Sequence, residues 1–151
     1  MIKMLEKICA LSLLSLFSTL ASAEIINIDN TELTRLAASG VPVIDIRTEG
    51  EWKSSGVIAG SKLITFFDAS GRSDKQQWLS RAAGLGSPDK PVILICRTGN
   101  RTQAAAQFLS GPAGYKTVYN VSKGISGWVG EGRPVVPVTP AMLGCAPGAR
   151  C

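Results

Sequence analysis

The chain has 151 residues, with 16 Lys and Arg against 11 Asp and Glu, four cysteines and no histidine. The absence of histidine excludes a Ser-His-Asp triad, a Cys-His dyad and a His-ligated zinc ion, so catalysis must depend on other groups. The length and the hydrophobic content of 45% allow one ordinary domain with a single core. The net charge of +5 comes from basic residues that are never adjacent in the sequence, so a nucleic-acid partner is not expected.

Residues 1–23 have the organisation of a secretory signal peptide. Lys3 and Lys7 precede an uncharged run over residues 8–23, and the small residues Ala21 and Ala23 suit a cleavage site. A membrane anchor is the rival interpretation, but the run has 16 residues, and a spanning helix needs roughly 20. We therefore expect cleavage after Ala23, a periplasmic or secreted protein, and no membrane-spanning segment in the mature chain.

Removal of the signal peptide changes the number of cysteines from four to three, because Cys9 leaves with it. An odd number in an oxidising compartment predicts one disulfide and one thiol that is free for a reason. Cys145 and Cys151 lie in residues 135–151, a Pro- and Gly-rich segment that we expect to be an irregular tail, and they can close a small ring. Cys96 is then the candidate free thiol.

Strands and helices alternate through the middle of the chain. The expected elements are a helix capped by Asp29 or Asn30, a strand over 41–46, helical turns over 49–54, a turn and short strand within 56–64, a helix over 76–83, strands over 92–95 and 117–121 with a helix between them, and a helical turn over 124–129. The unbroken apolar run over 92–95 is typical of a strand that helices cover on both faces. The alternation predicts an α/β domain with a parallel sheet flanked by helices.

A cysteine opens the loop that follows the strand at 92–95. Ligands bind at this position in open α/β sheets. Asn100 and Gln103 resemble a capping box, which predicts that the next helix starts at about Arg101 and directs its free N–H groups at the loop. Gly99 allows the left-handed backbone that lets successive amides converge on one point.

We therefore expect the sulfur of Cys96 to lie among amide dipoles, with the guanidinium groups of Arg97 and Arg101 close by. Such surroundings favour the thiolate and lower the thiol pKa below its free value of about 8.5. The alternative is an inert cysteine that fills space at the end of a strand. Two flanking arginines and a constrained Cys-x-x-Gly-x-Arg spacing weigh against that alternative.

These motifs resemble the rhodanese family of sulfurtransferases. The loop resembles the six-residue active-site loop of that family and consists of Cys96, Arg97, Thr98, Gly99, Asn100 and Arg101. Three further segments are similar to its other signatures: residues 43–47 with Glu51-Trp52, residues 56–61, and residues 114–128. Val57 replaces a usual His, Ala59 a usual Pro and Lys123 a usual Gly.

The resemblance implies a rhodanese domain over residues 24–134, with three α/β/α layers around a mostly parallel five-stranded sheet. It implies ping-pong sulfur transfer, in which Cys96 takes the outer sulfur of thiosulfate or another sulfane donor and releases sulfite. The persulfide then passes its sulfur to cyanide or to a thiol, which a protein could carry. The amides of residues 97–101 would hold the persulfide, and neither a metal nor an organic cofactor is implied.

Two supporting residues follow from the same resemblance. Asp45 and Arg47 lie at the end of a neighbouring strand, where we expect them to pair with each other or to brace the loop. Lys123 could add a positive charge near the mouth of the site.

Two other functions remain open from the sequence. Dual-specificity phosphatases of related architecture use Cys-x5-Arg, one residue longer than the spacing from Cys96 to Arg101. A non-catalytic sulfur-binding or redox-sensing module is the second alternative, with Cys145 and Cys151 exchanging with Cys96. The sequence names neither the physiological sulfur donor nor the acceptor.

Overall fold

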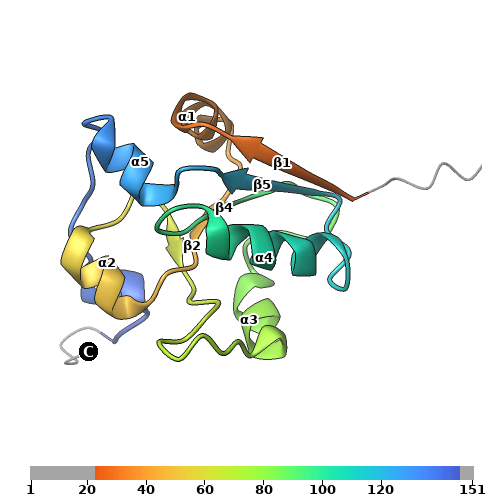
Figure 1. Ribbon diagram of the computed structural model, residues 1–151. Coiled ribbons are helices and arrows are strands. Elements are labelled where there is room, and N and C mark those ends of the chain that lie inside the picture. The colour runs from red at the N-terminus through yellow and green to blue at the C-terminus, as the bar shows by residue number, and fades with distance from the viewer. Residues whose placement is uncertain (1–22, 147–151) are drawn as a thin grey trace, which may run out of the picture.

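The central layer of the molecule is a five-stranded sheet, seen in a computed structural model that describes residues 23–146 (Figure 1). Its strands run in the order β1-β5-β4-β2-β3, and every neighbouring pair is parallel. The strands are β1 (Glu24–Ile28), β2 (Val43–Asp45), β3 (Lys62–Leu63), β4 (Val92–Ile95) and β5 (Thr117–Val121). The expected five-stranded sheet of parallel strands is therefore confirmed.

Helices cover both faces of this sheet. Those on one face are α1 (Asn30–Ala38) and α5 (Gly124–Gly130), and those on the other are α3 (Lys75–Ala82) and α4 (Asn100–Ser110). Figure 1 shows α1 and α5 together above the strands, with α3 and α4 below them. The predicted three layers are thus present. Among residues 23–146, no helix has the length and apolar character that crossing a bilayer requires.

The apolar run of β4 has a direct explanation in these layers. Ile93 and Ile95 pack with α1 and α5, whereas Val92 and Leu94 pack with α3 and α4. All four side chains are buried. Since side chains alternate between the two faces of a strand, only an uninterrupted apolar segment can satisfy both helical layers. Burial of each such side chain contributes about 1.5–3 kcal/mol relative to exposure.

The edge strand β1 was not among the strands located from the sequence. It pairs with β5 alone, with Ile28 opposite Val121. Of its five residues only Ile28 is buried, and Glu24 and Asn27 are exposed. Because it is covered so little, its sequence has neither the clean alternation nor the apolar run that marks a strand.

Helix α2 (Glu49–Ser55) lies at one edge of the sheet and carries a complete capping box. The Thr48 hydroxyl accepts from the N–H of Glu51, and the Glu51 carboxylate accepts from the N–H of Thr48. The Thr-x-x-Glu spacing is the signature of this cap and was legible in the sequence. It fixes the direction in which Glu51 leaves the helix.

Residues 135–146 of the expected irregular tail pack on the domain and contain two short ordered pieces. Val136 forms an antiparallel bridge with Val57, with N–H···O distances of 3.0 and 2.8 Å, and a 3-10 helix, η1 (Pro140–Leu143), follows. Half-buried Val136, Val138, Met142 and Leu143 pack on Trp52, Val57 and Leu63. Apolar side chains in the tail therefore cover apolar surface that α2 and β3 would otherwise expose.

Two expectations concern residues outside the described part of the chain. The proposed signal peptide falls on residues 1–22 apart from its last residue, and Cys151 lies beyond residue 146. Cys145 follows η1 directly. The pairing of Cys145 with Cys151 stays a prediction.

Candidate active site

The thiol of Cys96 lies at the centre of the carboxyl edge of the sheet. It follows β4, whose neighbours on either side are β5 and β2, and it precedes the first residue of α4 by four positions. Cys96 forms no disulfide and is only 1% exposed. The predicted strand, loop and helix around this cysteine are therefore all present.

Gly99 turns the loop so that its amide faces the sulfur. Its φ of +93° lies in the left-handed region, and its N–H donates a hydrogen bond to Sγ of Cys96 at 3.2 Å. A side chain here would also collide with the carbonyl oxygen of Ser122. Glycine is therefore required at position 99 for two reasons: the positive φ angle, and the lack of space for a side chain.

The predicted capping box at Asn100 and Gln103 is wrong. Gly99 is the N-cap of α4 and no side chain caps the helix. The N–H of Gln103 bonds the carbonyl of Gly99 at 3.1 Å, and the Gln103 side chain accepts instead from the amide of Asn120. Because the start of α4 faces the thiol, the sulfur occupies the place that a capping side chain would otherwise take.

The carbonyl groups of the loop are held by α5. The N–H groups of Ile125 and Ser126 donate to the carbonyls of Cys96 and Arg97 at 2.8 and 3.0 Å. A side chain at Gly124 would come within 2.5 Å of both carbonyl oxygens. This close approach leaves the loop carbonyls turned toward α5 and frees the loop amides for the thiol.

Thr102 is a site residue to which the sequence analysis assigned no role. It is fully buried, and its hydroxyl oxygen lies 2.8 Å from the carbonyl oxygen of Gly99 and 3.5 Å from Sγ of Cys96. The one hydroxyl proton donates to the Gly99 carbonyl beside a neutral thiol, and it can rotate to donate to the sulfur once the thiol is ionised. A threonine three residues after a cap glycine commonly bonds the backbone of its own turn. The Gly-x-x-Thr spacing in the sequence could therefore have indicated that Thr102 lies beside the loop.

The net effect of the surroundings is a lowered pKa of the Cys96 thiol. Burial raises this pKa, but hydrogen bonds from the Thr102 hydroxyl and from the N–H groups of Thr102, Thr98 and Gly99 outweigh burial. The expected lowering is therefore confirmed, and backbone amides contribute to it as predicted. Among these groups the Thr102 hydroxyl lowers the pKa most, and this contribution was not anticipated.

Arg101 forms an ion pair with Glu51. Its two terminal nitrogens lie 2.8 and 2.5 Å from the carboxylate oxygens. This pairing lowers the pKa of Glu51 to about 2 and raises that of Arg101, and the nearby Cys96 thiolate raises the Arg101 pKa further by a smaller amount. Arg101 therefore adds less free positive charge to the site than its position in the sequence suggested.

Asp45 and Arg47 form the predicted pair with each other. Both are buried, and the guanidinium bonds the carboxylate at 2.7 to 3.1 Å. Arg47 also donates to Ser55 Oγ at 2.6 Å and to the carbonyl of Gly56 at 2.8 Å. The pair thus anchors the end of α2, the helix that supplies Glu51. Removing one partner of such a buried pair costs about 3–5 kcal/mol.

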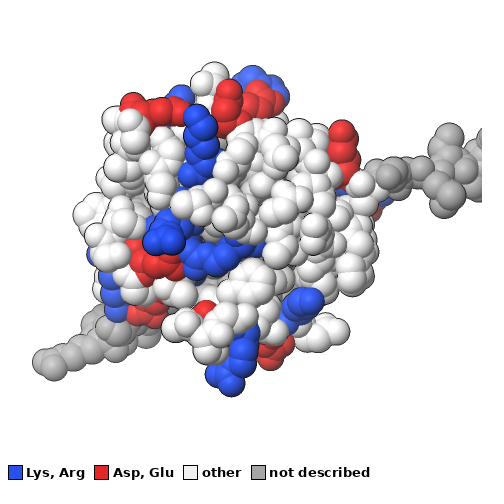
Figure 2. Space-filling view, in the orientation of Figure 1, with Lys and Arg blue, Asp and Glu red and all other residues white. Residues whose placement is uncertain are grey.

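Two open cavities flank the exposed side chain of Arg97, and both also touch Glu51. The first, of about 530 Å³, is polar and is lined further by Thr48, Asp68, Ala69, Thr98, Asn100 and Arg101. The second, of about 570 Å³, lies between α2 and α5. Figure 2 shows basic and acidic groups side by side on this face, in the region between α2, α5 and the start of α4. Lys123 lines neither cavity.

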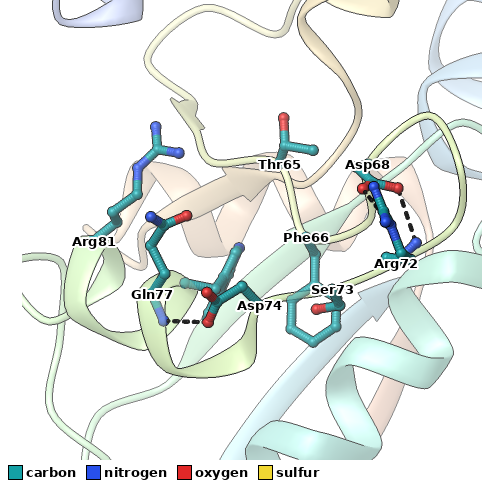
Figure 3. Close-up of a pocket in the computed structure, with 9 residues that line it drawn as sticks. Thr65, Phe66, Asp68, Arg72, Ser73, Asp74, Gln77 and Arg81 are labelled. Carbon is teal, nitrogen blue, oxygen red and sulfur yellow. Dashed lines mark hydrogen bonds and ion pairs between the residues drawn. The ribbon is translucent and has the colours of Figure 1, made fainter.

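A third cavity, of about 420 Å³, lies beside the first and shares Asp68 with it. Figure 3 shows the Asp68–Arg72 ion pair on one side and Asp74 bonded to the N–H of Gln77 on the other. With Arg81 its wall holds two basic and two acidic residues. The cavity offers a ligand no net charge.

The departures from the usual motifs have local explanations in two cases. Lys123 has a φ of −102°, which any residue adopts, and the glycine at 127 makes room for its side chain. Val57 is fully buried against the tail, where an apolar side chain is favoured. Nothing in the structure explains Ala59, which is exposed.

Residues 29–131 match the rhodanese-like domain family. The chain belongs to this family. Thiosulfate sulfurtransferase 18 of Arabidopsis thaliana is 28% identical over 125 residues, which cover 80% of this chain and 90% of that protein. Sulfurtransferases are thus among the relatives of this rhodanese-like domain.

Solved structures of rhodanese-like proteins have the same fold. A rhodanese-related protein of Thermoplasma volcanium is 32% identical with a TM-score of 0.55, covering 74% of this chain and 97% of that chain. The polysulfide-sulfur transferase homodimer of Wolinella succinogenes is 25% identical with a TM-score of 0.58, covering 79% and 83%. Together with the site geometry, these likenesses place the rhodanese-like chain in a sulfur-transfer family.

Replacing Thr102 with valine should raise the pKa of Cys96, because valine keeps the shape and removes the hydroxyl that stabilises the thiolate. The measurement is the rate of alkylation by iodoacetamide against pH, whose midpoint should move to higher pH. Thr98→Val is the matched control, since Thr98 contributes its N–H and not its hydroxyl. Equal midpoints for Thr102→Val and the wild type would show that the hydroxyl has no part in activation.

The Glu51–Arg101 pair should make stability depend on acid pH. The pKa of Glu51 is about 2 in the folded protein against an ordinary value of 4.5, so the pair stabilises the fold fully above that ordinary value and progressively less as pH falls toward 2. Urea unfolding at about pH 6 and about pH 3 should show Glu51→Gln less stable than wild type, with a smaller difference at the lower pH. The exposed Glu24→Gln is the control. A difference that does not change with pH would contradict this assignment.

Proposed function

We propose that the chain is a sulfurtransferase that carries the outer sulfur of thiosulfate, or of another sulfane donor, on Cys96 and delivers it to cyanide or a thiol. The observation that carries the proposal is the buried Cys96 thiol with a lowered pKa, bonded by the Gly99 amide at the end of β4. A thiolate held in this way is both a nucleophile and an anion that amides can stabilise.

In the first step the Cys96 thiolate attacks the outer sulfur of thiosulfate. A new S–S bond forms to Cys96, the S–S bond of thiosulfate breaks, and its electron pair leaves with sulfite. The exposed guanidinium of Arg97 is the group best placed to attract the dianion and to steady the departing sulfite. Arg101 supplies positive charge from one side while Glu51 holds its orientation.

In the second step a nucleophilic acceptor attacks the outer sulfur of the persulfide. The S–S bond to Cys96 breaks and its electron pair regenerates the thiolate, which the same amides stabilise. No net oxidation occurs and no histidine is required, because the leaving group is a thiolate whose pKa is already lowered.

The spacing between Cys96 and Arg101 favours sulfur over phosphate as the group transferred. Four residues separate them, which gives a smaller ring of amides than a loop with five. Arg101 pairs with Glu51 on one side and interacts with Cys96 on the other, so the spacing rather than the direction of this side chain favours sulfur.

Cys96 should be essential for sulfur transfer. Reduced wild-type protein treated with thiosulfate should gain the mass of one sulfur atom on the peptide containing Cys96, and should form thiocyanate from thiosulfate and cyanide. Cys96→Ser should lose both, because a hydroxyl at this position is neither ionised nor able to form a persulfide.

The competing functions predict other outcomes. Turnover of an aryl phosphate that is lost in Cys96→Ser would replace the proposal with a phosphatase. A mixed disulfide between Cys96 and a tail cysteine, found by peptide mapping in a protein without turnover, would favour a redox sensor. Absence of both persulfide and thiocyanate in the wild type would reject the sulfurtransferase.

We propose further that the protein is exported and loses residues 1–23. The support is the pattern of Lys3 and Lys7, the uncharged run and Ala21-x-Ala23. The intact mass of the protein recovered from the periplasm or medium of expressing cells should correspond to a chain starting at Glu24. Recovery of the full-length chain from the cytosol alone would contradict export.

A further inference from the structure

The second cavity beside Arg97 differs in chemistry from the first. Its walls are Ser54 and Ser55 of α2 and Ile125, Ser126 and Val129 of α5, and we name it the α2–α5 cavity. The first cavity is lined by charged and polar groups of the loop and of α4. Both cavities are lined by Arg97, the residue after Cys96, although Cys96 itself lines neither, so both adjoin the loop that begins at the thiol.

Val129 is the large hydrophobic side chain that residues 23–146 leave exposed, with 49% of its surface accessible. A single exposed valine is ordinary on a protein surface. Its position is informative, because it lies on the wall of a cavity that shares Arg97 with the candidate active site. Ile125, one turn earlier in α5, is buried and continues the apolar surface inward.

The polar groups of this cavity are neutral apart from Arg97 and two charges that are already paired. Arg47 is bonded to Asp45 and Glu51 to Arg101. The Ser126 hydroxyl makes no hydrogen bond to the part of the chain that the structure describes, although its N–H holds the Arg97 carbonyl. A ligand here would therefore meet one free cation, neutral hydroxyls and an apolar wall.

The size of the α2–α5 cavity, about 570 Å³, is far larger than cyanide or thiosulfate requires. Cavities of roughly 300–1,000 Å³ hold organic ligands of several functional groups. The first cavity, of about 530 Å³, is similar in size, so the walls and not the volumes distinguish the two. The charged and polar first cavity suits an inorganic dianion, and the α2–α5 cavity suits an organic molecule with a carboxylate, polar amides and an apolar part.

We propose that the α2–α5 cavity is an acceptor subsite for a low-molecular-weight peptidic thiol, an inference that rests on the sulfurtransferase function proposed above. A carboxylate of the acceptor pairs with Arg97, its amide groups bond the serine hydroxyls, and its apolar part lies on Val129 and Ile125. The acceptor thiolate attacks the outer persulfide sulfur, a new S–S bond forms, the bond to Cys96 breaks, and its electron pair returns to Cys96.

The test compares two acceptors of different size, reduced glutathione and cyanide, with thiosulfate as donor. In a ping-pong reaction kcat/KM for each acceptor reports only the second half-reaction, so the ratio of the two values isolates acceptor recognition. Val129→Trp should fill the cavity and lower the glutathione-to-cyanide ratio about tenfold, and Val129→Ser, which only removes apolar contact, should lower it about threefold. Ala104→Trp, on the exposed face of α4, is the matched control and should leave the ratio unchanged.

The outcomes separate this inference from the function on which it rests. Ratios equal to wild type in both Val129 variants, or an equal fall for both acceptors, would overturn the acceptor subsite while persulfide formation by thiosulfate still stands. Wild-type protein should also prefer glutathione to 2-mercaptoethanol, which lacks carboxylate and amide groups, and equal kcat/KM for the two thiols would likewise overturn it. Failure of thiosulfate to load Cys96 would instead reject the sulfurtransferase itself.

Discussion

The hydrogen bond from the Gly99 amide to the sulfur of Cys96 is the contact to which the rest of the site is fitted. It requires a glycine in the left-handed conformation. With the loop amides facing the sulfur, the loop carbonyls face α5, where they need hydrogen-bond donors because they are buried. The first N–H groups of α5 supply them, and they can approach only because residue 124 is glycine. The helix after β5 is therefore as much a part of the site as the loop itself.

The site carries less free positive charge than its two arginines, Arg97 and Arg101, suggest. Burial alone would keep the thiol protonated, and short-range hydrogen bonds, including the one from Thr102, reverse that effect. The charge of Arg101 is partly offset by Glu51, whose orientation depends on the Thr48 cap. Arg97 is left as the accessible positive group of the loop, which suits the proposed reaction, in which one anion is attracted and another is released.

The two cavities beside Arg97 fit the proposed ping-pong transfer, in which donor and acceptor never bind together. A donor and an acceptor that share one sulfur atom can be recognised on separate walls when both walls adjoin the loop that carries the thiol. Here α4 and the loop form one wall, and α2 and α5 form the other. Asp45 and Arg47 hold α2 at its distance from the sheet, and the C-terminal tail covers its outer side.

The sequence by itself determined the alternation of strands and helices, the position of Cys96 at the end of the central strand, the Asp45–Arg47 pair and the family. These features are local in the chain: apolar runs, glycines and fixed spacings. Tertiary structure decided the rest. The edge strand β1, the packing of the tail on Trp52, the Arg101–Glu51 pair across fifty residues and the loss of the expected cap at Asn100 all depend on which segments meet in space. The partner of a side chain depends on burial and on distances in the folded chain, and the local sequence pattern contains neither.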